Sequence, residues 1–214
     1  MIPEQSVTIP VAPELTLEGA LVLPASATVG VVLCHPHPLY GGDMDNHVVG
    51  AAAEACQARG LATLRFNFRG VGGSRGAWDE GRGEQDDVRQ ALAFLAQRLA
   101  PSARLALAGY SFGASMSARV AASGQRLAGL SLIAPPLAAP GWKNPSTLQV
   151  EGPILLIAGR DDHYCPPDAL TALARHLPNT TATILDDTDH FFSTALRPLG
   201  AAISTWAQSI IPKT

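Results

Sequence analysis

Residues 109–113 read Gly109-Tyr110-Ser111-Phe112-Gly113, a G-x-S-x-G sequence, and this stretch decides the fold. An apolar run at residues 104–108 precedes it, and a helical pattern at residues 112–123 follows it. A serine at a tight turn from strand to helix is raised above the carboxyl edge of a sheet, and the glycines on either side leave room for the sharp bend. The stretch therefore predicts a nucleophilic serine on an α/β scaffold. The alternative is a turn serine without a chemical role.

Around this motif, short apolar runs alternate with longer helical patterns, which indicates an α/β fold in which helices cover a mostly parallel sheet. The predicted strands are residues 15–24, 29–34, 61–68, 104–108, 127–134, 153–158 and 180–185. The predicted helices are residues 46–59, 84–99, 112–123, 166–177 and 193–211. The stretch 70–83 is rich in glycine and is predicted to be a loop. No internal repeat or linker interrupts the pattern, so residues 1–214 are predicted to form a single domain.

Composition excludes several classes of protein. The chain has 214 residues, of which 47% are hydrophobic and 15% charged, so it is too apolar for disorder. The net charge is −3, residues 1–58 contain no Lys or Arg, and the arginines elsewhere are scattered, which predicts no nucleic-acid partner. There is no basic leader and no apolar run of the ~18 residues that a membrane span needs, so we expect a cytoplasmic protein without a membrane partner. The three cysteines are few and far apart, and they are predicted to be buried thiols.

A serine nucleophile needs a base and an acid, and candidates for both follow predicted strands in the chain order Ser, Asp, His. Asp161 and Asp162 follow the strand at 153–158, and we favour Asp162 as the carboxylate that orients the imidazole. His190 follows the last predicted strand and is the expected base. The acids at 186, 187 and 189 are too close to His190 in sequence to reach the far side of its ring, so we interpret them as turn and cap residues.

An acyl-transfer site also needs two N–H donors for the oxyanion of the tetrahedral intermediate. The backbone N–H of Phe112, directly after the nucleophile, is the first expected donor. The second must come from the loop Cys34-His35-Pro36-His37-Pro38-Leu39-Tyr40-Gly41-Gly42, which follows the strand at 29–34. Prolines have no N–H, so His37 is our first choice and Leu39 the second.

With these pieces in place, the sequence resembles the α/β-hydrolase superfamily, and within it the small lidless bacterial serine hydrolases related to the dienelactone-hydrolase group. The matching pieces are the loop beginning at His35, the Phe68-Arg-Gly-Val-Gly-Gly-Ser stretch, the serine motif, Asp162 and the Asp-His190 pair. The resemblance implies a mostly parallel eight-stranded sheet whose second strand is antiparallel. It also supports Asp162, because family members often carry the acid three residues after a strand-end glycine and a proline four further on, as in Gly159 and Pro166. The nucleophile is Ser111 and not cysteine, so the substrate of the dienelactone hydrolases is not carried over.

The expected function is cleavage of an ester or thioester of a small-molecule acyl substrate, without a cofactor. The glycine loop after Arg69 fails the dinucleotide pattern, and no phosphate-binding lysine motif is present. One alternative is a metal-dependent hydrolase that uses His35, His37, Asp43 and Asp45, although the two prolines disfavour a coordinating geometry and we predict no metal site. The other alternative is a binding protein on a hydrolase scaffold, since a fold does not prove turnover.

The length of the connection at residues 135–152 indicates whether a lid can cover the site. Residues 135–152 are too few for a multi-helix cap, so the site is expected to lack a large lid. Leu39, Tyr40 and Trp142 are the predicted substrate contacts in a shallow open groove walled by residues 137–142 and Tyr40. Such a groove favours soluble short-chain esters or thioesters and predicts no activation at a lipid interface.

Overall fold

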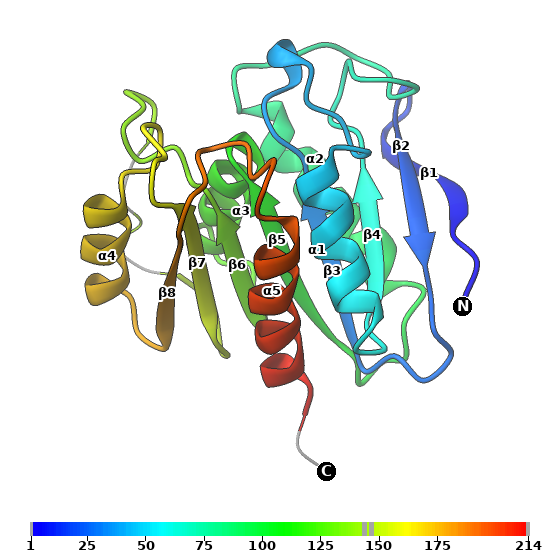
Figure 1. Ribbon diagram of the computed structural model, residues 1–214. Coiled ribbons are helices and arrows are strands. Elements are labelled where there is room, and N and C mark those ends of the chain that lie inside the picture. Colours follow the sequence, from blue (N-terminus) through cyan, green and yellow to red (C-terminus); the bar gives the residue numbers. More distant parts are fainter. Residues whose placement is uncertain (1, 143–144, 146–147, 213–214) are drawn as a thin grey trace.

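The computed structural model describes residues 2–142, 145 and 148–212, and in this part of the chain one eight-stranded sheet carries helices on both faces (Figure 1). The strands are β1 (Gln5–Ala12), β2 (Leu15–Val22), β3 (Val29–Cys34), β4 (Ala62–Phe66), β5 (Arg104–Tyr110), β6 (Gly129–Ile133), β7 (Ile154–Gly159) and β8 (Thr180–Leu185). Their order is β1-β2-β4-β3-β5-β6-β7-β8, with β2 antiparallel to both neighbours and all pairings from β4 to β8 parallel. The predicted α/β architecture is confirmed.

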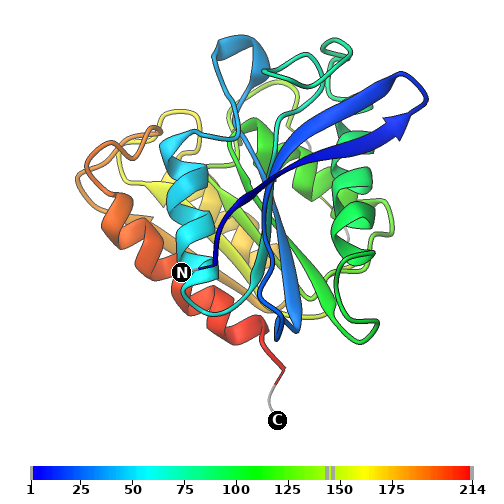
Figure 2. The same cartoon turned by 90° about the vertical axis from the view of Figure 1, so that its right-hand side faces the viewer.

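The helices are distributed over the two faces of the sheet (Figures 1 and 2). On one face α1 (His47–Gln57) packs against α5 (Leu196–Ile210), and on the other α2 (Gly83–Ala96) packs against α3 (Phe112–Ala122). Helix α4 (Pro167–His176) contacts β7 and β8. Each helix turns an apolar stripe toward the sheet, as in α1, whose buried residues are Val48, Val49, Ala52, Ala53 and Cys56. Burial of these stripes stabilises the layers.

Strand β1 is a difference from the sequence prediction, which placed no strand there. Only Ile9 of its eight residues is buried, and Pro10 lies within it. An edge strand with so little buried apolar surface carries a weak pattern, and proline is tolerated there because one side needs no ladder hydrogen bonds. Helix ends also shift, since α2 ends at Ala96 and α5 begins at Leu196.

The carboxyl ends of β3, β5, β7 and β8 meet at one edge of the sheet, and the loops after them carry the expected site residues. The connection from β6 to β7 contains no helix in its described residues, so the absence of a large lid agrees with the structure there. All three cysteines are free and buried. None of the helices in the described part of the chain has the length and hydropathy of a membrane span.

Candidate active site

Ser111 occupies a strained turn between β5 and α3. Its φ is 54° and its ψ is −113°, a conformation that non-glycine residues rarely adopt. A Cβ at Gly113 would collide with the carbonyl of Cys34, and one at Gly109 would collide with the carbonyl of Gly113, so only glycine fits at both places. The turn places Ser111 at the amino end of α3, where the helix dipole favours negative charge.

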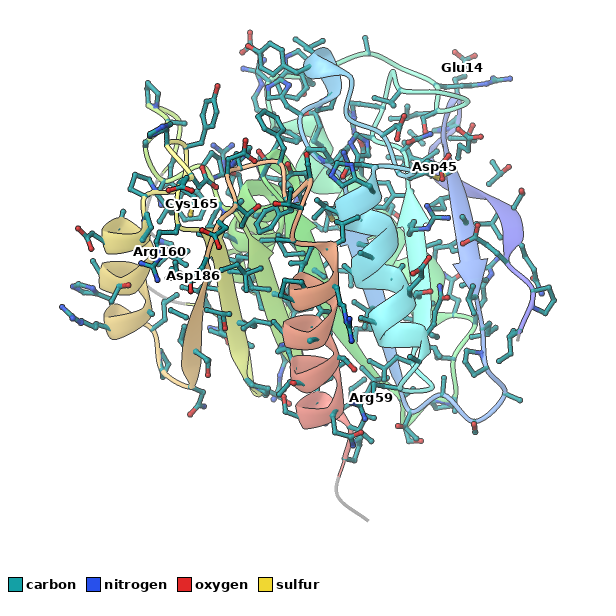
Figure 3. All side chains as sticks on the ribbon, in the orientation of Figure 1. Glu14, Asp45, Arg59, Arg160, Cys165 and Asp186 are labelled. Atoms are coloured by element: carbon teal, nitrogen blue, oxygen red, sulfur yellow. The ribbon has the colours of Figure 1, made fainter. Side chains whose placement is uncertain are left out.

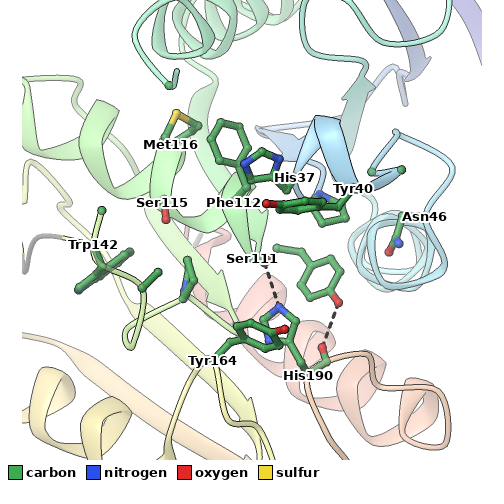
Figure 4. A pocket seen from close by; sticks show the side chains of 18 of the residues that line it. His37, Tyr40, Asn46, Ser111, Phe112, Ser115, Met116, Trp142, Tyr164 and His190 are labelled. Atoms are coloured by element: carbon green, nitrogen blue, oxygen red, sulfur yellow. Dashed lines mark hydrogen bonds between the residues drawn. The ribbon is translucent and has the colours of Figure 1, made fainter. Parts of the chain in front are cut away.

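Ser111, His190 and Asp162 form a chain of hydrogen bonds, of which Figure 4 shows the bond between Ser111 and His190. Ser111 Oγ lies 2.9 Å from His190 Nε2, and His190 Nδ1 lies 2.8 Å from Asp162 Oδ2. A carboxylate can only accept a hydrogen bond, so His190 Nδ1 carries the proton and Nε2 is free to accept the hydrogen of the serine hydroxyl. The other oxygen of Asp162 accepts the backbone N–H groups of Tyr164 and Cys165, each at 2.8 Å, which holds this buried carboxylate in place.

The competing acids lie elsewhere. Asp161 is exposed, and its backbone N–H donates to the carbonyl of Thr188. Asp186 forms an ion pair with Arg160 on the neighbouring loop (Figure 3). Asp189 accepts the N–H of Phe191 and so forms a local turn. The structure therefore brings Asp162, and not these residues, to the imidazole.

Two backbone N–H groups beside Ser111 are available for a ligand. In the described part of the chain, neither the N–H of Phe112 nor that of His37 donates to a protein acceptor, while both residues line the cavity around Ser111. The N–H of Leu39, by contrast, donates to Nδ1 of His37 at 3.2 Å. Unpaired N–H donors facing a site are what an oxyanion requires. This arrangement favours His37 over Leu39 as the partner of Phe112.

The loop from β3 depends on a buried histidine. His35 Nδ1 lies 2.6 Å from the carbonyl of Pro36, and its Nε2 accepts the N–H of Phe68 at 3.0 Å. One ring nitrogen must donate and the other accept, so the imidazole is neutral. Burial lowers the pKa of His35 from 6.5 to about 4, against a smaller opposing effect of the Pro36 carbonyl. Burial also lowers the pKa of His37.

The four side chains of the metal hypothesis are engaged in different interactions. Both nitrogens of His35 are used as described, and His37 Nδ1 accepts the N–H of Leu39. Asp43 caps its own loop by accepting the N–H of Asp45, whose carboxylate in turn binds Arg65. Among the residues that the structure describes, no three His, Cys, Asp or Glu side chains gather as metal ligands would. The structure thus gives this hypothesis no support.

Two hydrogen bonds that hold the loop of His190 in position were not predicted from the sequence. The hydroxyl of Tyr110 donates to the carbonyl of His190 at 3.0 Å, and His47 Nε2 lies 2.8 Å from the carbonyl of Phe191, which can only accept. Together they tie the loop of the base to β5 and to the start of α1. Tyr110 lies inside the serine motif, so its position in the chain was a usable signal, whereas His47 is distant from His190 in sequence and offered none.

A cavity of about 590 Å³ surrounds Ser111 and extends to both sides of it (Figure 4). Tyr40 and Asn46 lie on one side, and Ser115, Met116 and Trp142 on the other. Tyr40 and Trp142 therefore line the cavity, as expected of substrate contacts. The expectation for Leu39 is not supported, because this side chain is 63% exposed and lies outside the cavity lining. The turn Pro38–Tyr40 directs it toward solvent.

Aromatic rings form one wall of the cavity. His37 lies with its ring centroid 4.6 Å from that of Tyr40, 4.7 Å from that of Trp78 and 5.1 Å from that of Phe112. The rings are tilted against one another, which is a favourable geometry for aromatic pairs. The wall is thus largely aromatic.

This geometry defines an α/β scaffold with a Ser-His-Asp constellation at its carboxyl edge, and the comparisons with known proteins agree with the scaffold. Residues 28–210 match the model of a family described as alpha/beta hydrolase domain. The chain is 36% identical to a Xanthomonas campestris protein described as an α/β serine hydrolase without a lid, with a TM-score of 0.86 and coverage of 100% of this chain and 99% of that one. It is 33% identical to an α/β serine hydrolase homologue from Coxiella burnetii, with a TM-score of 0.85 and coverage of 96% and 97%.

An uncharacterized protein of Rickettsia prowazekii is also similar, with 32% identity over 207 residues that make up 92% of this chain and 87% of that protein. The chain belongs to the alpha/beta hydrolase family, and its small bacterial relatives support hydrolase activity. The particular kinship to the dienelactone-hydrolase group is not established by these matches.

Proposed function

We propose that the chain is a serine hydrolase that cleaves a carboxylic ester or thioester through an acyl-enzyme. The observation that carries the proposal is the hydrogen-bonded chain from Ser111 through His190 to Asp162, which sits beside two unpaired backbone N–H groups. A nucleophile, a base in the correct tautomer and an oxyanion site are the parts that acyl transfer needs. The substrate is a small molecule that carries an acyl group.

The proposed reaction has two stages. His190 Nε2 accepts the hydroxyl proton as Ser111 Oγ attacks the carbonyl carbon, and the N–H groups of Phe112 and His37 stabilise the oxyanion. The imidazolium, stabilised by Asp162, then gives its proton to the departing alcohol or thiol and leaves an acyl-Ser111 ester. Water enters the open cavity, loses a proton to His190 and attacks this ester. The free acid leaves, and the proton returns to Ser111.

The test is covalent labelling with a fluorophosphonate, followed by peptide mapping and a panel of acyl substrates. We expect the label on Ser111, and we expect Ser111→Ala to lose roughly 10⁴-fold or more in turnover while it stays folded, because the three residues act as a unit. Ser123→Ala is the matched control, since it removes an exposed serine hydroxyl at the far end of α3, outside the cavity lining, and is expected to keep the label on Ser111. A label mapped to another residue, or turnover that persists in Ser111→Ala, would overturn the proposal.

The same experiment separates the two alternatives. A metal-dependent hydrolase would lose activity to a chelator and ignore the fluorophosphonate, and a binding protein would turn over no acyl substrate. We expect turnover that resists EDTA.

A further inference from the structure

One arm of the cavity carries a row of polar side chains along α3. Ser111, Ser115 and Arg119 are four residues apart, and this spacing places them on one face of a helix. All three line the cavity. At 1.5 Å per residue, Ser115 lies about 6 Å and Arg119 about 12 Å from Ser111 along the helix axis.

Within this row Ser115 and Arg119 have spare hydrogen-bonding capacity. Ser115 is 8% exposed, and its hydroxyl has no hydrogen-bond partner in the described part of the chain. A guanidinium has five N–H donors, and among the described residues that of Arg119 makes one hydrogen bond, from Nη2 to the carbonyl of Gly141 at 3.0 Å. The helix face therefore presents a hydroxyl and most of a guanidinium to whatever occupies this arm.

The charge of Arg119 also has no counterpart. No carboxylate of the described residues lies within ion-pair distance of it. Glu80 is the one acid in the described cavity lining, and it points to Arg82, at 3.5 Å. Among the other half-buried arginines, Arg65 and Arg69 each bind a carboxylate, while Arg104 donates to the carbonyl of Ile210. Arg119 differs from these three because it lines the cavity around Ser111, where a bound anion can reach it.

The surroundings of Arg119 place it at the far end of a covered arm. A Cβ at Gly81 would lie 3.1 Å from Arg119 Nη1, so the loop after β4 passes directly over the guanidinium. Gly141, on the loop after β6, holds it from the other side. Met116 and Trp142 line the same side of the cavity as Ser115 (Figure 4), and Arg119 lines the cavity one helical turn beyond Ser115. Apolar groups in the middle and a cation at the end fit an elongated ligand with an anionic tip.

Resting on the proposed function, we infer that the preferred substrate is an anionic ester or thioester whose carboxylate or phosphate binds Arg119, about 12 Å along α3 from the nucleophile. The part of the substrate between the reacting carbonyl and this anion packs on Met116 and Trp142, and Ser115 provides a hydroxyl midway. Carboxylate and phosphate match the planar fork of a guanidinium. The anion belongs either to the acyl group or to the leaving group.

Two substrate pairs test the inference in the wild-type enzyme. The acyl pair is the p-nitrophenyl monoester of suberic acid against p-nitrophenyl octanoate. The leaving-group pair is p-acetoxyphenylpropionate against p-propylphenyl acetate. We expect kcat/KM for the anionic member of one pair to exceed that of its neutral partner by about tenfold or more, as one charge-assisted hydrogen bond provides. No preference in either pair would overturn the inference.

Variants then assign the preference to Arg119. In Arg119→Met, the ratio of kcat/KM for the anionic substrate to that for the neutral one is expected to fall to about one. Arg119→Lys is expected to keep part of the preference for the anionic substrate. Arg119→Glu is expected to prefer an ester that carries an ammonium group in place of the anion. Arg126→Met is the matched control, because Arg126 is exposed on the loop after the carboxyl end of α3, is not among the residues that line this cavity and pairs with Glu151. It is expected to leave the ratio unchanged.

The outcomes separate this inference from the proposed function. If Ser111 is labelled and neutral esters are hydrolysed, but the ratio stays near one or survives in Arg119→Met, the inference is wrong and the proposed function stands. If the fluorophosphonate does not label Ser111, the proposed function fails first. The wild-type comparison needs no variant, so misfolding of one variant leaves the test intact.

Discussion

The neutral imidazole of His35 predicts a specific loss of stability in acid. Its Nε2 accepts the N–H of Phe68, so a proton added there would place two donors against each other in a buried site. Burial lowers the pKa of His35 in the folded chain to about 4, while the unfolded chain keeps the usual value of 6.5. Between these values the unfolded chain binds more protons. The free energy of unfolding therefore falls as the pH falls from 6.5 toward 4. Below about pH 4, His35 causes no further loss of stability.

The size of the effect follows from the two pKa values. At about pH 4.5 the folded chain leaves His35 mostly neutral and the unfolded chain has it almost fully charged, which costs about 2 to 3 kcal/mol relative to about pH 7.5. His35→Gln removes the titrating group. The variant is less stable than the wild type at neutral pH, but its loss of stability between the two pH values should be smaller than that of the wild type by about 2 to 3 kcal/mol.

The assay is urea unfolding followed by the fluorescence of the three tryptophans at both pH values. Other titrating groups contribute alike to both chains and cancel in the comparison. His163→Gln, which replaces an exposed histidine in the loop after β7, is the control and should lose as much stability in acid as the wild type. Equal losses in wild type and His35→Gln would refute the reasoning. A ¹⁵N spectrum in which Nδ1 of His35 is unprotonated at neutral pH would refute it independently.

Two further predictions concern the hydrogen bonds around His190. Asp162→Asn should lower kcat by roughly 10⁴-fold because it favours the wrong imidazole tautomer, whereas the exposed Asp161→Asn should cost less than about tenfold; comparable losses in steady-state kinetics would contradict the assignment. Tyr110→Phe removes only the hydroxyl that holds the His190 carbonyl and should lower kcat about tenfold with KM unchanged. A fall in thermal stability without a fall in kcat would show that Tyr110 contributes to stability and does not position His190.

Much of the fold and of the proposed triad could be predicted because both depend on local patterns. Parallel strands need apolar residues on both faces, and the loops after them meet at one edge, so Ser111, Asp162 and His190 were placed together by their positions after strands. The turn at Ser111 required its two glycines for steric reasons that are visible in the motif. The edge strand β1 was missed because a strand with a single buried residue carries little apolar pattern.

The remaining features depend on contacts between segments that are distant in the chain. The choice between His37 and Leu39 is a local exception: the turn at Pro38–Tyr40 directs the amide of Leu39 to the imidazole of His37, two residues away, and the sequence pattern does not reveal this backbone geometry. The bond from His47 to the carbonyl of Phe191 spans 144 residues. Likewise, Arg119 became the cation at the end of a cavity only because the loops bearing Gly81 and Gly141 pack over it. Periodicity records which face of an element is buried, but which groups meet across that face is set by how the elements pack.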